Sequence, residues 1–304
     1  MAAINRNALS HRIWQNRHFY LFISPFFVLF AVFGFYPLLY SLYLSFTKFD
    51  GLTPPLHVGF ENFISLYQDE EFFTSLWNTL VMGAIYIPPM FIFAFLFANI
   101  LNNTRLRGLG LFRMAIFVPC ITPMVVIAIV FSLLFSTQNG LLNWIWSGLT
   151  WPLPGGPYAP IKWIESAEWS KISVSIVLVW RWTGYNMVLM LAGLQGIPKD
   201  YYEAATIDGA TRWQQMYSIT MPLMRPTFVF CTIMSIIGTT YMFEEVFVMT
   251  LGGPGTSSTN FGVFLFNTAF TDFRFGYASC AAYVVAVMVF ILSLIVLRWR
   301  RLDA

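Results

Sequence analysis

FYLFISPFFVLFAVFGFYPLLYSLYLSFT, residues 19–47, contains no charged side chain and lies between His18 and Lys48. A helix needs about 20 mostly apolar residues to cross a bilayer, so this run can span one with some tilt despite Pro25 and Pro37. The run is too long for the apolar core of a signal peptide, and no small-residue cleavage site followed by a polar segment comes after it. We therefore expect a first transmembrane helix that stays attached to the chain.

The composition extends this conclusion to the whole chain. Of the 304 residues, 58% are hydrophobic and 10% charged, against roughly 45–50% and about 25% in soluble domains. This excludes a water-soluble enzyme of this size. We predict an all-α, polytopic membrane protein, with a cytoplasmic N-terminal segment over residues 1–18 and a single transmembrane domain over residues 19–304. Six transmembrane helices are expected, because five further apolar runs follow at Leu76–Leu101, Met114–Phe135, Ile172–Ile197, Pro226–Met249 and Tyr277–Leu297.

The distribution of basic residues indicates the orientation of these helices, because Lys and Arg in short loops favour the cytoplasm. With both termini inside, the cytoplasmic segments hold twelve of the 17 basic residues and only four of the 14 acidic residues. The sequence therefore predicts an N-in, C-in topology. The twelve are Arg6, Arg12, Arg17, Arg105, Arg107, Arg113, Lys199, Arg212, Arg225, Arg298, Arg300 and Arg301.

The outer loop from Ser136 to Lys171 holds five of the 11 tryptophans. Because Trp favours the membrane–water interface, we expect part of this loop to lie along the outer surface. An aromatic belt without a binding role is the plainer interpretation, and contact with an external protein is left open. The prolines and glycines that should interrupt regular structure in the middle of the loop are Pro152, Pro154, Gly155, Gly156 and Pro157.

The sequence offers no recognisable catalytic machinery. It has no Gly-Lys dipeptide and hence no Walker motif for nucleotide hydrolysis. Its three histidines form no cluster with Cys or with paired carboxylates, and its three cysteines lie far apart in apolar stretches. We expect no catalytic residues, no metal, no cofactor and no nucleic-acid partner.

One polar segment between the fourth and fifth predicted helices, residues 198–222, reads PKDYYEAATIDGATRWQQMYSITMP. Pro198 and Pro222 each suit a first helical turn, and Gly209 suits the turn between two short helices. We therefore predict a cytoplasmic helix–turn–helix hairpin. Its small residues would let another protein approach the backbone, or let the hairpin pack on its own membrane domain.

The spacing Glu203-Ala204-Ala205, three residues, Gly209, nine residues, Ile219-Thr220-Met221-Pro222 resembles the E-A-A–G–I-x-L-P loop of permease subunits of binding-protein-dependent ABC importers. Met221 replaces the Leu of that pattern, an apolar swap of similar volume. The resemblance implies that Glu203 lies in a coupling helix seated in a groove of an ATPase. The residues it assigns to this ATPase contact are Glu203, Ala204, Ala205, Asp208, Gly209, Ile219 and Pro222.

Further segments are similar to the sugar-type permeases of this family, and among them to the MalF-like half. The Gly252-Gly253-Pro254 segment and the C-terminal Arg298-Trp299-Arg300-Arg301 support the MalF-like assignment. The other matching segments are Phe35-Tyr36-Pro37, Ser41-Leu42, Gly59–Phe63, Asn78-Thr79-Leu80, Gly140–Asn143 and Ser257-Ser258-Thr259.

The resemblance also implies a division of labour in a bacterial inner (plasma) membrane. A second homologous, MalG-like permease would complete the pathway, two cytoplasmic ATP-binding subunits would drive it, and an extracytoplasmic solute-binding protein would deliver the solute. Membrane lipid would surround the multi-pass chain. Transport would proceed by alternating access, in which partners and ligands shift the transporter between conformational states by binding one state more tightly than another. Monosaccharides, disaccharides, oligosaccharides, polyols and glycerol phosphate are all compatible substrates.

The resemblance places a substrate pathway at the middle of the fourth and fifth predicted helices. Polar and aromatic side chains there suit sugar hydroxyls and ring faces, whereas a lipid-facing Asn would be costly. Hydrogen bonding between packed helices is the alternative role. The candidates are Gly184, Tyr185, Asn186, Thr239, Tyr241 and Met242, with Thr240 beside them.

Arg181 is the one basic residue well inside a predicted span, and it cannot face lipid cheaply. Counting along two uninterrupted helices, we predict a charge pair with Glu244, or less favourably with Glu245. The pair would be a permanent tie or a gate contact.

Two other classes of protein stay open. A self-sufficient secondary carrier or channel would work without an ATPase, although few ionisable residues are available for a relay. A membrane scaffold or sensor would not transport at all. Uptake by proteoliposomes that contain only this chain would favour the carrier.

Overall fold

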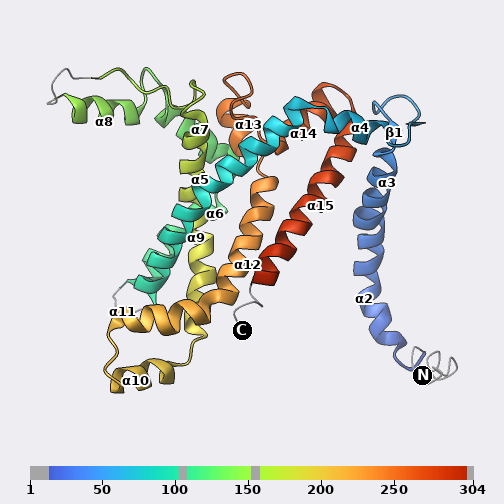
Figure 1. Ribbon diagram of the computed structural model, residues 1–304. Helices are drawn as coiled ribbons and strands as arrows, with labels where there is room; N and C mark the ends of the chain where they lie inside the picture. The colour runs from blue at the N-terminus through green and yellow to red at the C-terminus, as the bar shows by residue number, and fades with distance from the viewer. Residues whose placement is uncertain (1–13, 103–107, 152–157, 300–304) are drawn as a thin grey trace. The chain divides into compact units, whose positions relative to one another are not determined.

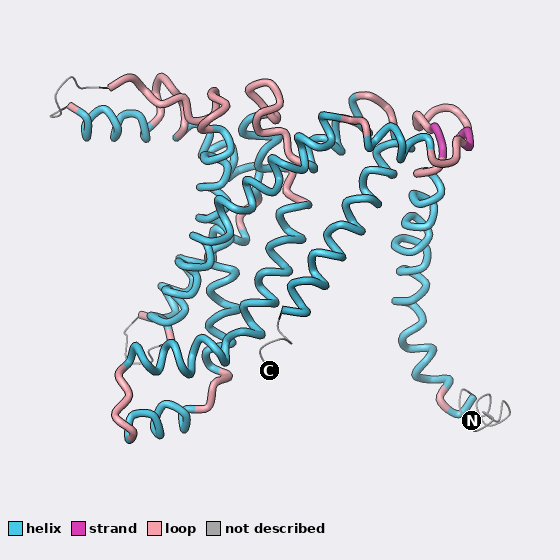
Figure 2. Tube along the Cα trace, in the orientation of Figure 1, coloured by secondary structure: helices cyan, strands magenta, loops and turns pink. Residues whose placement is uncertain are grey.

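The computed structural model describes residues 14–102, 108–151 and 158–299 (Figure 1). Figure 2 shows that these residues are mostly helical, with loops between the helices and one short strand pair, which confirms the all-α prediction. The contacts divide the chain into two units, one formed by residues 1–67 with 268–283 and the other by residues 68–267 with 284–304. Each unit is described separately below.

The first unit contains the first predicted span. Helix α2 (Arg17–Phe30) continues through a π-helical turn, η1 (Ala31–Phe35), into α3 (Tyr36–Leu44). A short antiparallel pair, β1 (Thr47–Lys48) with β2 (Leu56–His57), and helix α4 (Glu61–Tyr67) follow. Asn62 ties these parts together, because its amide donates to the Ser45 and Thr47 carbonyls, each at 2.9 Å.

The second unit is built on two long helices, α5 (Glu70–Leu101) and α9 (Ser170–Gln195). They pack along each other, and both also contact α12. The remaining elements are α6 (Leu109–Ile121), α7 (Met124–Leu134), α8 (Leu141–Thr150), α10 (Lys199–Ile207), α11 (Arg212–Gln215), η2 (Met216–Thr220), α12 (Met221–Thr240), α13 (Glu244–Thr250) and α14 (Phe261–Phe266). The π-helical turn η3 (Asn267–Thr271) and helix α15 (Phe275–Trp299) each contribute residues to both units.

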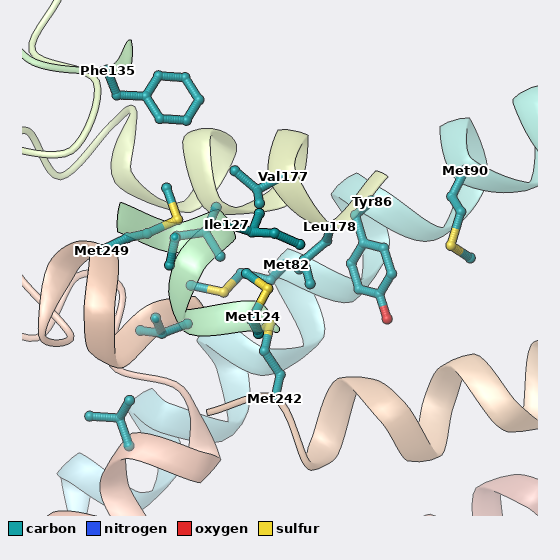
Figure 3. Close-up of a cluster of buried hydrophobic side chains, with 14 residues drawn as sticks. Met82, Tyr86, Met90, Met124, Ile127, Phe135, Val177, Leu178, Met242 and Met249 are labelled. Atoms are coloured by element: carbon teal, nitrogen blue, oxygen red, sulfur yellow. The ribbon is translucent and has the colours of Figure 1, made fainter. Parts of the chain in front are cut away.

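Two buried clusters hold this second unit together. Figure 3 shows the first, where side chains of α5, α7 and α9 meet Met242 and α13 around Met82, Ile127 and Val177. The second joins α5, α9 and α12 around Met187, Met190 and Met224. Unbranched Met side chains fill the irregular spaces between helices that cross at different levels.

The third predicted span, Met114–Phe135, is not continuous, and this expectation is corrected. Helices α6 and α7 meet at an angle of 95°. Pro123 has no N–H and forces the preceding residue out of the helical conformation, and Thr122 accordingly has a ψ of 135°. The apolar composition of this run conceals the break.

The fifth predicted span, Pro226–Met249, also differs from the structure. One helical run extends from Arg212 to Thr240, and the chain then leaves helical geometry at residues 241–243 before α13 begins. The break is held from elsewhere in the chain, because the Asn260 amide donates to the carbonyl of Met242. A side chain at Gly262 would place its Cβ 2.3 Å from the same carbonyl oxygen, so only glycine fits there.

Among the described residues, five helices are long and apolar enough to cross a membrane, or six if the bent α6–α7 pair counts as one span. Six spans and the N-in, C-in orientation therefore remain predictions. The boundary at residue 18 and the single domain over residues 19–304 also remain predictions. The basic residues Arg6, Arg12, Arg105, Arg107, Arg300 and Arg301, and the break expected at residues 152–157, lie outside the described residues.

Candidate functional site

The predicted hairpin is present at one end of the second unit (Figure 1). Helix α10 follows the N-cap Pro198 rather than containing it, and Gly209 adopts a φ of +79° in the turn before α11. This left-handed conformation is the one in which glycine carries no steric penalty. The Thr211 side chain and the Gln214 side chain form a reciprocal capping box at the start of α11.

Side-chain hydrogen bonds tie the two arms of the hairpin together. The Gln215 amide donates to the Thr206 hydroxyl at 3.0 Å, and the hydroxyls of Tyr202 and Thr220 are 2.9 Å apart. These bonds tie α10 to the helix that follows the turn.

The predicted coupling residues lie mostly on the surface of this hairpin. Glu203, Ala204, Asp208, Gly209 and Pro222 are exposed, whereas Ala205 and Ile219 are half-buried. The sequence analysis missed the apolar residues beside them. Ile207 and Trp213 are 86% and 73% exposed, and Tyr217 stacks on Trp213 with ring centroids 6.4 Å apart. Large apolar side chains in an otherwise polar segment are the signal that could have revealed them.

Pro222 lies in the first turn of α12, as predicted, but α12 is not separate from α11, because the two are continuous through the π-helical turn η2. Pro222 therefore lies inside the continuous run from Arg212 to Thr240, directly after the π-helical turn η2. Because proline offers no N–H to the preceding turn and its ring crowds that turn, the wider π-helical geometry accommodates it. Pro37 follows η1 at the same spacing in the first unit.

A second candidate feature is a cavity of about 490 Å³ between α5, α9, α12 and α13. It combines aromatic side chains with three charged groups in an otherwise apolar wall. The predicted pathway residues Tyr185, Asn186, Tyr241 and Met242 line it. Its other walls are formed by Tyr86, Met90, Leu178, Arg181, Trp182, Met234, Ser235, Gly238, Phe243, Glu244 and Glu245.

Gly184 and Thr239 are not part of this wall. A Cβ at Gly184 would lie 2.1 Å from the Ile116 carbonyl oxygen, so glycine here allows α9 to approach α6 closely. The Thr239 hydroxyl is 2.7 Å from the Tyr86 hydroxyl and donates to Ser235. Both positions have the helix-packing role that the sequence analysis kept as the alternative. Tyr86 and Trp182 were missed, because an isolated aromatic residue in an apolar run gives no signal of its own.

The charge pair forms with Glu245 rather than Glu244, which corrects the favoured assignment. Arg181 Nη1 lies 3.3 Å from Glu245 Oε1, and the two side chains are 15% and 8% exposed. The register was counted along an uninterrupted helix, whereas α13 starts anew at Glu244 after the break. Glu244 lines the same cavity but is exposed. Arg181 Nε is buried without a hydrogen-bond partner among the described residues.

No group of three His, Cys, Asp or Glu side chains within the described part of the chain could hold a metal ion. The polar groups of the cavity wall are one ion pair, one exposed carboxylate, the hydroxyls of the tyrosines and of Ser235, the Trp182 indole N–H and the Asn186 amide. Such a set binds neutral polar molecules by hydrogen bonding and by stacking on aromatic faces.

Comparison with known proteins identifies the class. Residues 91–302 match the family described as "Binding-protein-dependent transport system inner membrane component". The chain is 36% identical over 296 residues to the lactose transport system permease protein LacF of Rhizobium radiobacter, which covers 96% of each chain. It is 34% identical to the arabinooligosaccharides transport system permease protein AraP of Halalkalibacterium halodurans, covering 90% of this chain and 85% of that protein.

The fold is also found in a solved structure. A chain of a bacterial ABC transporter involved in the import of the acidic polysaccharide alginate superposes with a TM-score of 0.82 at 22% identity, covering 97% of this chain and 98% of that one. This chain belongs to the family of binding-protein-dependent transport system inner membrane components. It is a multi-pass permease subunit of the inner membrane, and its family is one of transport components rather than enzymes.

Proposed function

We propose that this chain forms half of the translocation pathway of an ATP-driven sugar importer and transmits ATPase movement through its 198–222 hairpin. The observation that carries the proposal is the hairpin itself. The family-type spacing lies on a projecting hairpin in which Ile207, Trp213 and Glu203 are all exposed. An apolar patch of this kind with a charged rim is typical of a protein interface.

The proposed partners follow from the class of the protein. A second homologous permease of the MalG-like kind completes the pathway, two ATP-binding subunits receive the hairpins, and an extracytoplasmic solute-binding protein supplies the solute. The chain itself catalyses no bond chemistry in this scheme. Closure of the ATPase dimer moves the hairpin, and the hydrogen bonds from α10 to α11 and to η2 carry that movement into α12.

The 490 Å³ cavity is the proposed contribution of this chain to the pathway. Its walls carry two carboxylates and one guanidinium, and Arg181 is already paired with Glu245. The remaining uncompensated charge is therefore the negative charge of Glu244. Because a second anion would be repelled in such a site, we propose a neutral saccharide or polyol as the substrate, in keeping with the sugars named for the lactose and arabinooligosaccharide relatives.

The docking part of the proposal is tested with hairpin variants of the assembled transporter. Glu203→Lys and Ile207→Asp should weaken co-purification of the ATPase and lower uptake, while the chain stays in the membrane. Glu168→Lys changes an exposed acidic residue outside the hairpin, and as the matched control it should leave co-purification of the ATPase at the wild-type level. Normal ATPase binding and normal uptake in both hairpin variants would contradict the proposed contact.

The substrate part is tested by competition. Unlabelled neutral disaccharides and polyols should inhibit uptake of a labelled neutral sugar in a transporter with its binding protein, whereas glycerol phosphate and uronates should not. Glu244→Gln should reduce the discrimination against the anions. Equal competition by neutral and anionic compounds in wild type would refute a site selective for neutral molecules.

A further inference from the structure

Helix α8 extends sideways from the end of α7 that is opposite the hairpin (Figure 1). Two residues of the Gly140–Asn143 segment hold it there. A Cβ at Gly140 would lie 2.2 Å from the Ser136 carbonyl oxygen, so the entry into α8 requires glycine. The Asn143 amide nitrogen donates to the Ile161 carbonyl at 2.8 Å and to Thr137 at 3.2 Å.

The amide oxygen of Asn143 completes this anchor. It accepts from the Ile161 N–H at 3.0 Å and from the Trp163 indole N–H at 3.1 Å. Trp163 in turn packs against Phe135, with ring centroids 5.8 Å apart. One buried amide therefore joins α8, the end of α7 and the segment that returns toward α9. These bonds fix the position of α8 relative to α7 and the return segment.

The two sides of α8 differ sharply in exposure. Asn143 and Thr150 are buried, and they face the return segment, because Thr150 Oγ1 accepts from the Tyr158 N–H at 3.3 Å. The opposite side carries an apolar stripe at the i, i+3, i+4, i+8 spacing of one helix face. Its members are exposed by 41–72%: Leu141, Trp144, Ile145 and Leu149.

The direction of this stripe follows from the return segment. In Figures 1 and 2, the chain after residue 157 runs on the side of α8 that faces away from the hairpin end of the second unit. Because this segment bonds to the Asn143 and Thr150 side of α8, the apolar stripe on the other side points toward the level occupied by the membrane-length helices.

We propose that α8 is an interfacial helix whose stripe of Leu141, Trp144, Ile145 and Leu149 is inserted into the outer leaflet of the lipid bilayer. The preceding helix α7 also exposes apolar side chains, among them Val130 and Leu133, which are 48% and 69% exposed. Trp is the side chain enriched at the boundary between headgroups and acyl chains. A shallow helix of this kind buries its apolar side by about 5–10 Å into that boundary.

The absence of charge on α8 favours lipid over a soluble protein as the occupant. No charged residue occurs between Leu141 and Trp151, whereas interfaces with a soluble partner have a polar rim around their apolar centre. The lack of Lys and Arg also means that anionic headgroups are not needed. Binding of α8 to the bilayer should therefore be insensitive to salt and to the fraction of anionic lipid. The return segment, with Lys162 on it, is left on the aqueous side.

The proposal is tested by spin labelling of the assembled transporter in nanodiscs of zwitterionic phospholipid. Cys120, Cys231 and Cys280 are first replaced by Ala, and single cysteines are then introduced as Ile145→Cys, Leu149→Cys and Lys162→Cys. The accessibility of each label to oxygen is compared with its accessibility to a water-soluble nickel complex. Labels at 145 and 149 should show an oxygen-to-nickel ratio several-fold higher than the label at 162.

Two results would overturn the proposal. One is a ratio at 145 and 149 equal to that at 162, which would place the stripe in water. The other is a nickel accessibility at 145 and 149 that is high in the transporter without solute-binding protein and falls when that protein is added. This would show that a protein, rather than lipid, covers the stripe. Size-exclusion profiles and ATP-driven uptake of the labelled transporters establish that they are folded. A matched Asn143→Ala variant should release α8 and lower the ratio at 145 toward that at 162.

Discussion

Gly184 illustrates how a residue in a pathway region can have a packing role. An added Cβ would lie 2.1 Å from a backbone oxygen of α6, which cannot move independently of its helix. We predict that Gly184→Ala lowers the free energy of unfolding by about 1–3 kcal/mol through overpacking. Thermal unfolding of the purified subunit measures this. Gly110→Ala, at a glycine of α6 with nothing within 4 Å, should not lower stability, and an equal loss in both variants would contradict the packing role.

The Arg181–Glu245 pair gives a second prediction at the level of residues. Glu245→Gln leaves a buried guanidinium without its counter-ion, and removing one partner of a buried pair costs about 3–5 kcal/mol. We therefore expect a clear fall in thermal stability and in uptake. Glu244→Gln is the matched control and should keep wild-type stability, because its carboxylate is exposed. A larger loss of thermal stability from Glu244→Gln than from Glu245→Gln would contradict this prediction, because it would show that Arg181 pairs with Glu244.

The sequence predicts the coupling and pathway residues unevenly, for physical reasons. The hairpin was predictable because Gly209, Pro198 and Pro222 act locally on backbone geometry. The partner of Arg181 was not, because a pair between helices depends on a register that a distant residue, Asn260, resets through the Met242 carbonyl. Gly184 carries no local sign of whether it faces a cavity or another helix.

At the scale of elements, two prolines sit at the same distance behind a π-helical turn. Pro222 follows η2 and Pro37 follows η1. In Pro222→Ala the N–H is restored, so we expect the turn to relax toward α-helical geometry and to shift the hairpin by about one residue, roughly 100° around the helix axis. Uptake should fall more than ATPase activity, as measured together in proteoliposomes.

The control for this variant is Pro226→Ala, which changes a proline of the same helix that has no such turn before it. It should change coupling little. Unaltered coupling in Pro222→Ala, or an equal loss in both variants, would show that the π-helical turn does not set the position of the hairpin.

Hydropathy predicts where the chain crosses the membrane better than where its helices end. The runs at Leu76–Leu101 and Tyr277–Leu297 lie within α5 and α15. The breaks at Thr122–Pro123 and at residues 241–243 were missed, because both lie within apolar stretches. Pro123 is a local signal of the first break, because proline cannot continue a helix without a kink. The second break, at residues 241–243, has no proline or glycine of its own, and it is explained by the contacts of Asn260 and Gly262 with the Met242 carbonyl.

The N-in, C-in orientation of the whole molecule is predicted from the excess of Lys and Arg in the segments expected inside. We predict that green fluorescent protein fused after Ala304 is fluorescent, and that alkaline phosphatase inserted after Glu168 is active, because the first reporter matures inside and the second outside. A dark C-terminal fusion together with an inactive insertion at Glu168 would reverse the topology.

Sugar uptake by proteoliposomes with defined subunit composition distinguishes an ATP-driven importer from a self-sufficient carrier. Vesicles containing this chain, its second permease and the ATPase should accumulate a neutral sugar only when ATP is inside with the ATPase and binding protein is present outside. Vesicles with Glu203→Lys in this chain should hydrolyse ATP without accumulating sugar. Uptake by vesicles that contain this chain alone, driven by an ion gradient and unaffected by ATP, would contradict the account.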